Sequence, residues 1–405
     1  MTVHNLTPIV RSVARARGPS ALAAAASRSA LPSRAIQTRA AAASTRLSPN
    51  AIPTSSSSPA RRIPAWSRSL ATQTTTPDFV IPVIDFSAFV RPDATDADRA
   101  RTSQQLTQAF KSSGFAYLSN HGISTEQIDA TFAKSAEFFK LPFDKKDELA
   151  WKDPRANRGY VAEGRERVTQ ATSAEEIAAL REQAPDYKES LEIGNDHDPV
   201  WKNEWPHERD APEFKHTMLA FQKAAHELHM KVMSSIAIGL GLDARFFNDK
   251  CDEQWHTLRL LHYPSVKTDK LKVEGSARAG EHSDYGSITL LFQDSVGGLE
   301  AKNPHTGVYH AADPIPGTIV VNVGDLLARW SNDQLRSTLH RVKAPQAVDA
   351  NAEYTPTRYS IAFFCNPNEN QLIESLPNFD SKEGSKYDRI LTKDYLAKRL
   401  SETYA

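Results

Sequence analysis

The chain has 405 residues, enough for one large domain or two, and its formal net charge is zero. That zero hides an asymmetry, because residues 1–77 carry ten arginines and no lysine, aspartate or glutamate, which leaves residues 78–405 with 39 basic and 49 acidic side chains. The acidic excess in residues 78–405 argues against nucleic-acid binding. Two cysteines are too few for a disulfide framework. No apolar run approaches the ~20 residues that insert stably in a membrane.

Residues 1–77 are rich in alanine, serine, proline and arginine, and their only aromatic residue is Trp66. Such a segment cannot bury enough apolar surface to offset the entropy of ordering, so we assign it no fold and expect disorder. An arginine- and serine-rich segment without acidic residues is typical of a transit peptide, and arginine without lysine favours the mitochondrion. Arg68-Ser69-Leu70-Ala71 resembles a mitochondrial processing site. The alternative is a low-complexity extension of a cytoplasmic protein.

Residues 78–250 are predicted to combine helices with edge strands. Strands are expected at 81–86 and 115–118, and helices at 96–111, from Ser124 to Pro142, and at 212–238. Ile128, Phe132, Ala136 and Phe139 form the expected buried stripe of the second helix. The stripe of the long third helix is Phe214, Met218, Phe221, Ala225, Leu228, Val232 and Ile236.

Residues 251–405 change to short strands separated by turn residues. The expected strands are 257–263, 287–293, 298–302, 307–312, 317–323, 340–344 and 358–365, and a helix is expected near 386–401. Many short strands at regular spacing are typical of a sandwich or barrel. Helices early in the chain and strands later favour the α+β class.

The first candidate site is a metal centre at His282, Asp284 and His340. Side chains two residues apart share one face of an extended strand, so His282 and Asp284 are expected to point the same way. Two imidazoles and one carboxylate form a facial triad, which suits Fe(II) and leaves coordination positions open.

A second candidate site follows on the strand predicted at 358–365. Arg358 and Ser360 share one face of it and would clamp a carboxylate through a guanidinium and a hydroxyl. Phe363 and Phe364 alternate further along, so one of them is expected to line a pocket, and we favour Phe364.

These residues and their surroundings resemble the iron- and 2-oxoglutarate-dependent dioxygenases of the isopenicillin N synthase-like family. The resemblance covers roughly residues 80–400. The matching segments, in the family's order, are Ile81-Pro82-Val83-Ile84-Asp85-Phe86, Gly114-Phe115, Asn120-His121-Gly122, Arg158-Gly159-Tyr160, Gly280-Glu281-His282-Ser283-Asp284-Tyr285-Gly286, Gly297-Gly298-Leu299, Asn322-Val323-Gly324-Asp325, Trp330-Ser331-Asn332, His340-Arg341-Val342 and Arg358-Tyr359-Ser360.

The resemblance implies a double-stranded β-helix, or jelly roll, as the core within 251–405, with 78–250 as an N-terminal helical and strand region and helices at the flanks. It implies Fe(II) at the triad, O₂ and 2-oxoglutarate as co-substrates, and oxidation of a small-molecule metabolite with release of succinate and CO₂. Hydroxylation, desaturation and cyclisation all remain open.

The resemblance also assigns further site residues. Arg358 and Ser360 would hold the distal carboxylate of 2-oxoglutarate, with Tyr263 as a hydrogen-bond partner. Arg158 and Tyr160 match a loop that closes over the substrate pocket, and Lys188 matches a run of an acidic residue followed by Lys-Glu. For Lys188-Glu189, a structural salt bridge is the favoured alternative.

Several questions stay open at this level. An oxidase of the same fold that uses no 2-oxoglutarate, or a non-catalytic binding protein, would carry similar motifs. His226 and His229 are expected on a solvated or half-buried helix face, and His256 has no carboxylate at ligand spacing on a shared strand face. Neither the substrate nor the oligomeric state can be predicted.

Overall fold

The computed structural model describes residues 79–153, 156–165, 186–272, 277–344, 352–377, 379 and 384–404. The expectations for residues 1–77 lie outside these described residues. Residues 73–405 form one compact unit, which is the subject of the following paragraphs.

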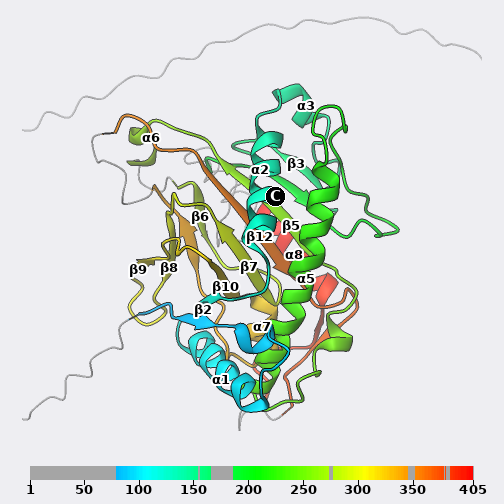
Figure 1. The fold of residues 1–405 in the computed structure, drawn as a ribbon, viewed down its shortest axis with the longest axis vertical. Helices are drawn as coiled ribbons and strands as arrows, with labels where there is room; N and C mark the ends of the chain where they lie inside the picture. The colour runs from blue at the N-terminus through cyan, green and yellow to red at the C-terminus, as the bar shows by residue number, and fades with distance from the viewer. Residues whose placement is uncertain are drawn as a thin grey trace, which may run out of the picture. The chain divides into compact units, whose positions relative to one another are not determined.

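Two sheets make up the core of this unit (Figure 1). The larger sheet has the order β1 (Val83–Asp85), β2 (Phe115–Ser119), β10 (Thr318–Val323), β7 (Ile288–Gln293), β12 (Arg358–Cys365), β5 (Thr257–Tyr263), β4 (Glu189–Ile193) and β3 (Gly159–Val161). The smaller sheet has the order β6 (Ala279–His282), β11 (His340–Val342), β8 (Leu299–Lys302) and β9 (Tyr309–Ala311). A further pair joins β13 (Leu372–Ile373) to β14 (Ile390–Leu391).

The predicted α+β jelly roll is confirmed by this arrangement. All seven strands expected after residue 257 are present within two residues of their predicted ends. The prediction missed β3, β4, β6, β13 and β14. Strands before and after residue 250 share the larger sheet, so the boundary predicted there does not separate two structural domains.

The alternation of side chains along the strands separates two cores. On β12, Ile361 and Phe363 pack into the core beneath the helices, whereas Ala362 packs into the core between the two sheets. On β5, Leu260 faces the helices and Leu261 faces the space between the sheets. One face of each central strand is therefore free to build a site inside the jelly roll.

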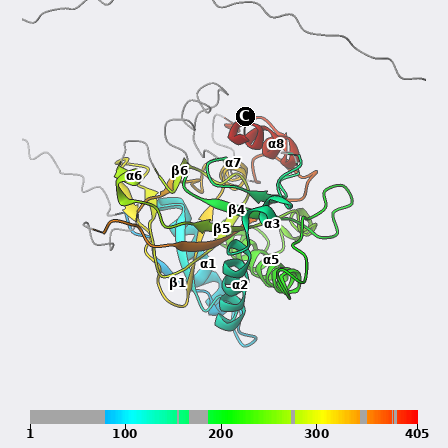
Figure 2. The same cartoon turned by 90° about the horizontal axis from the view of Figure 1, so that it is seen from above.

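Helices surround the sheets. They are α1 (Asp96–Ser112), α2 (Thr125–Phe139), α3 (Phe143–Asp147), α5 (Phe214–Gly239), α6 (Thr268–Lys272), α7 (Asp325–Trp330) and α8 (Thr392–Tyr404). Of these, α1, α2 and α5 contact strands of the larger sheet. Figure 1 shows α2 and α5 in front of the strands, where both contact β12, and Figures 1 and 2 place α8 on the opposite side.

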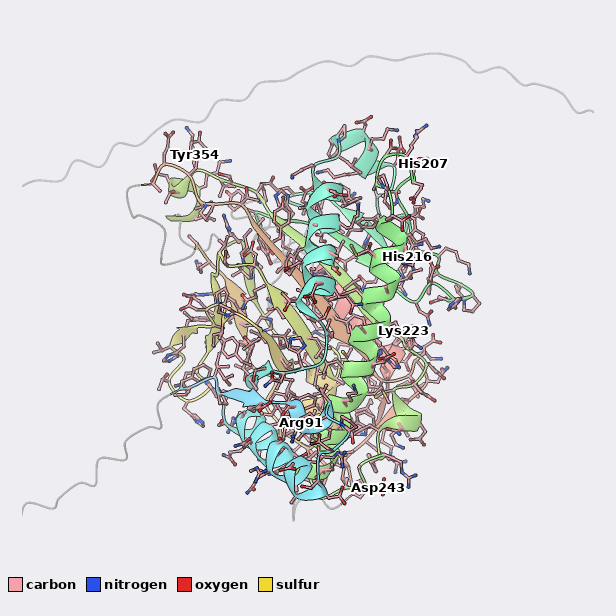
Figure 3. The ribbon with its side chains drawn as sticks, in the orientation of Figure 1. Arg91, His207, His216, Lys223, Asp243 and Tyr354 are labelled. Carbon is pink, nitrogen blue, oxygen red and sulfur yellow. The ribbon has the colours of Figure 1, made fainter. Side chains whose placement is uncertain are left out.

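The long helix α5 follows its predicted pattern. All seven residues of the predicted stripe are buried, and His216 and Lys223 lie on the exposed side, as Figure 3 shows. The stripe predicted for α2 was only partly right. Phe139 is buried, but Ile128, Phe132 and Ala136 are half-buried, because the helix is rotated so that Thr131 and Ser135 face inward.

No helix among the described residues is long and apolar enough to cross a membrane.

Candidate active site

A cavity of about 140 Å³ lies between the two sheets. The larger sheet lines it with residues of β2, β5, β7, β10 and β12, and the smaller sheet with residues of β6, β8 and β11. Side chains of α8 complete the wall. The predicted metal and carboxylate sites both open into this cavity.

The three predicted metal ligands meet at one point of the cavity wall. His282 and His340 are direct cross-strand partners on β6 and β11, and their ring centroids are 4.3 Å apart. The Nε2 atoms of His282 and His340 lie 3.9 and 3.7 Å from Oδ1 of Asp284. One ligand atom from each residue lies within 4.8 Å of the other two, so a single ion can contact all three.

The hydrogen bonds around the triad leave the three ligand atoms available. Nδ1 of His282 lies 2.8 Å from the Gly280 carbonyl, and Nδ1 of His340 lies 3.1 Å from the Thr338 carbonyl. Since a carbonyl only accepts, each Nδ1 carries the proton and each Nε2 keeps a lone pair. Such outer partners fix the orientation of metal-binding imidazoles.

Asp284 is held in the same way. Its Oδ2 accepts hydrogen bonds from Thr289 Oγ1 at 2.5 Å and from Asn322 Nδ2 at 2.7 Å, which turns Oδ1 toward the imidazoles. Burial alone would raise the pKa of Asp284, but the two histidines and these hydrogen bonds outweigh it and hold the pKa below its usual range. Burial, followed by His340, lowers the pKa of His282. The site thus favours a carboxylate at Asp284 and a neutral imidazole at His282, the forms that bind a metal.

The prediction that His282 and Asp284 share one face of a strand was only half right. His282 ends β6, but Asp284 stands beyond the strand, in the turn that leads to β7. Gly286 allows this turn to pack against the end of β12, because a Cβ there would lie 2.2 Å from the Cys365 carbonyl oxygen. The start of α7 secures the other side, where Asp325 N donates to the Asp284 carbonyl at 2.7 Å.

The predicted carboxylate clamp lies on β12 and β5. Arg358, 1% exposed, stands directly opposite Tyr263 in the strand register, with its guanidinium 4.7 Å from the centre of the Tyr263 ring. Its Nη1 donates to Ser360 Oγ at 3.3 Å and its Nη2 to Gln293 Oε1 at 3.2 Å. Its Nε is buried without an acceptor among the described residues. A buried guanidinium with an unsatisfied donor fits a ligand that brings a carboxylate.

Comparison with known proteins identifies the family. The model of the 2OG-Fe(II) oxygenase superfamily matches residues 254–367, and a model described as non-haem dioxygenase in morphine synthesis N-terminal matches residues 81–208. The chain is 37% identical to the 2-oxoglutarate-Fe(II) type oxidoreductase ppzD of Metarhizium majus, over 83% of this chain and 100% of that protein. The chain belongs to the 2OG-Fe(II) oxygenase superfamily. The oxygenase is also 36% identical to the proline hydroxylase buaE of Petromyces alliaceus, over 74% of this chain and 93% of that one.

A solved structure lies nearer in sequence. The Neurospora crassa T7H in complex with alpha-KG and thymine is 47% identical to the oxygenase and superposes with a TM-score of 0.73, over 80% of this chain and 98% of that chain. These likenesses confirm the predicted family and make this protein a 2-oxoglutarate- and Fe(II)-dependent dioxygenase that oxidises a small molecule. They do not favour the oxidase or the non-catalytic alternative.

The residues of the oxygenase fit both groups that the family uses. His282, Asp284 and His340 would hold Fe(II), and Arg358 and Ser360 would hold the distal carboxylate of 2-oxoglutarate. When bound, iron and O₂ would supply the oxidative chemistry that converts 2-oxoglutarate to succinate and CO₂. The protein's own part is to orient the co-substrate and to exclude water from the buried cavity.

Two of the four predicted substrate residues line the cavity. Phe364 lies on the cavity face of β12, and Lys188 lines the wall while pairing with Asp186 at 3.2 Å. The structural alternative of a salt bridge therefore applies to Lys188 as well as to Glu189, whose Oε2 accepts from Lys146 at 2.7 Å outside the cavity lining. Contact of Phe364 and Lys188 with substrate stays a prediction.

Arg158 and Tyr160 do not line the cavity, and their contact with substrate stays a prediction. Arg158 donates to the Ala156 and Asn157 carbonyls at 3.1 and 3.0 Å. Tyr160, on β3, points into the core beneath the helices and donates to Glu189. Both side chains have partners that hold the edge of the larger sheet.

Several cavity residues were not predicted. On β5, Thr257 and Arg259 share the cavity face with Leu261 and Tyr263, and strand alternation from Tyr263 could have found them. The other unpredicted residues of interest are Asn157, Tyr285, Asn366, Leu396 and Leu400. Leu261 itself lines the cavity.

A second group of histidines also comes together, contrary to the sequence expectation. His229 is buried rather than solvated or half-buried, and its ligand atom lies within 4.8 Å of those of half-buried His226 and buried His256. The backbone N–H of Asn366 donates to Nδ1 of His256 at 3.0 Å, so neutral His256 carries its proton on Nε2. That Nε2 lies 3.1 Å from Nδ1 of His226 and donates to it. The geometry therefore favours a hydrogen-bonded pair of neutral imidazoles over a second metal centre.

Proposed function

We propose that this oxygenase hydroxylates a small planar pyrimidine base of the thymine type. The 47% identity to T7H, whose structure contains thymine, motivates the choice of substrate. The observation that carries it within this chain is the composition of the cavity beyond the clamp. There Phe364 offers an aromatic face, and Arg259 places its guanidinium 5.4 Å from the centre of that ring.

On the cavity face of β12, the clamp for 2-oxoglutarate and the proposed binding site of the base lie one after the other. Arg358, Ser360, Ala362 and Phe364 follow one another on this face, so the co-substrate clamp and the aromatic ring stand at opposite ends of one strand segment. Asn157 and Asn366 add amide groups near the aromatic end. A pyrimidine base has a flat face for stacking and alternating donors and acceptors along its edge, which match a phenyl ring with nearby amides and a guanidinium.

Succinate formation by the purified holoenzyme tests this proposal. Thymine should stimulate the release of succinate above the substrate-free rate, with one oxidised pyrimidine formed for each succinate, whereas L-proline, suggested by the relative buaE, should not. Replacing Phe364 by alanine should raise the KM for thymine by roughly tenfold through lost stacking, with 2-oxoglutarate binding unchanged. Stimulation by L-proline and not by thymine would refute the pyrimidine assignment.

We also infer that the oxygenase is imported into mitochondria. The composition of residues 1–77, with ten arginines and no acidic residue, supports this. A fluorescent protein fused behind residues 1–77 should enter mitochondria, and the same fusion with the ten arginines replaced by glutamine should stay in the cytosol. Cytosolic fluorescence of the unaltered fusion would instead support the low-complexity alternative.

A further inference from the structure

Arg278 is a fully buried arginine that the site described above does not use. It precedes β6, and its side chain is 0% exposed. Its Nη2 donates to Thr355 Oγ1 at 2.7 Å and to the Pro356 carbonyl at 2.5 Å. These two residues continue from exposed Tyr354, labelled in Figure 3, and lead directly into Arg358. Arg278 is therefore tied to the segment that carries the co-substrate clamp.

The remaining donors of Arg278 are unsatisfied. Its Nε and Nη1 are buried without an acceptor among the described residues, as is Nε of Arg358. Asp294 is a nearby acid, but its Oδ1 accepts from Val296 N at 3.0 Å and its Oδ2 from Tyr359 N at 2.6 Å. Two buried guanidinium groups thus lie in one region without a carboxylate bonded to either in the described part of the chain.

Such an arrangement is unfavourable until an anion arrives. A buried charge without a counter-charge carries a large desolvation cost, and neighbouring like charges add to it. Burial, followed by the charge of Arg358, lowers the pKa of Arg278 to about 10, which leaves it cationic at neutral pH. The distal carboxylate of 2-oxoglutarate would bring negative charge, with two oxygens that accept several hydrogen bonds, to the clamp beside Arg278.

We propose that Arg278 is a second cation for the distal carboxylate of 2-oxoglutarate, in addition to Arg358. Arg278 does not line the cavity, so it is a positioning residue that acts through its charge and through the Thr355–Pro356 segment. This inference rests on the use of 2-oxoglutarate and does not depend on the pyrimidine substrate.

The test compares two keto acids that differ only at their far end. The Mn(II)-loaded protein, with no pyrimidine present, is titrated by calorimetry with 2-oxoglutarate and with 2-oxobutyrate, which lacks the distal carboxylate. Replacing Arg278 by glutamine or by methionine should raise the Kd for 2-oxoglutarate roughly tenfold or more, while the Kd for 2-oxobutyrate stays within about twofold of the unaltered protein. Arg278→Lys keeps the charge and should recover part of the lost affinity.

Arg341→Gln serves as the matched control. Arg341 lies on the neighbouring strand β11 and pairs with Glu300 at 2.7 Å, so its loss should change neither Kd. An unchanged Kd for 2-oxoglutarate in both neutral Arg278 variants would overturn the proposal. Equal weakening of both keto acids, or failure of both neutral variants to fold and bind Mn(II), would show that Arg278 serves only the structure of its segment.

Discussion

Replacing His282 by alanine is expected to abolish Fe(II) binding and turnover while leaving the fold intact. The imidazole supplies one of the three ligands found among the described residues, and its Nε2 lies 3.9 Å from Asp284 Oδ1. Without it, two ligands would hold the ion, and the geometry that orients the co-substrate would be lost. We expect turnover to fall by at least about 10³-fold, since no other group replaces the open facial geometry at the ion.

Metal analysis and circular dichroism separate this effect from unfolding. His282 is at the end of a strand and lines the cavity. Replacement by alanine should therefore leave the circular dichroism spectrum close to that of the unaltered protein and should cost little stability. A matched control is His310→Ala on β9, whose ring contacts Phe79 with centroids 4.8 Å apart and which should keep full iron content and activity. An active, iron-loaded His282→Ala protein would remove the basis for the proposed metal centre.

The metal triad shows both the strength and the limit of sequence reasoning. A histidine and an aspartate two residues apart, with a distant second histidine, predicted the correct three ligands. The prediction placed Asp284 on the strand, whereas the structure holds it beyond β6 through Thr289 and Asn322. Those anchors come from β7 and β10, and contacts between separate strands depend on a sheet order that local spacing does not encode.

Strand alternation worked wherever a strand had been recognised. On β12 it correctly separated Arg358, Ser360 and Phe364 from Phe363. The same rule applied to β5 would have added Arg259, because that strand was predicted with the right ends. The rule could not be applied to β3 and β4, which were read as loops.

That missed pair of strands explains why Tyr160 was expected on a loop rather than on a strand. The short segment Gly159–Val161 becomes a strand only by pairing with β4, which in turn pairs with β5. Within that register Tyr160 turns toward the helices and meets Glu189, a partner distant in the sequence. A three-residue strand has too little periodicity of its own for a prediction of which face is buried.

The position of the C-terminal helix α8 over the cavity also could not be predicted from its sequence. Leu396 and Leu400 are one helical turn apart and lie on one face, as their spacing implies. Their position over the cavity depends on the contact of Tyr395 with Asp325, whose Oδ2 accepts from the tyrosine hydroxyl at 3.0 Å. Asp325 also accepts from Ser283 Oγ at 3.2 Å, next to the metal ligand Asp284. The helix is therefore connected to the metal turn through this carboxylate and through Arg399, whose guanidinium lies 4.3 Å from the centre of the Tyr285 ring.

Replacing Arg358 by alanine is the second change with a large expected effect. We expect the Kd for 2-oxoglutarate to rise on the order of 100-fold, equivalent to about 3 kcal/mol, because a carboxylate in a buried site loses its charged partner. Ser360→Ala removes only a neutral hydroxyl from the same clamp and should cost about 1 kcal/mol. Calorimetric titration of the Mn(II)-loaded variants measures both values.

A comparison of 2-oxoglutarate with 2-oxobutyrate in the Arg358→Ala protein tests the assignment of the clamp. If Arg358 holds the distal carboxylate, its loss should affect 2-oxoglutarate far more than 2-oxobutyrate, and Fe(II) content should be unchanged because Arg358 is not a metal ligand. The stacking of Arg358 on Tyr263, at 4.7 Å, and its bond to Gln293 would be lost in both titrations, so the 2-oxobutyrate result isolates this packing contribution. Equal losses for the two keto acids would mean that Arg358 supports the cavity wall and that another group binds the carboxylate.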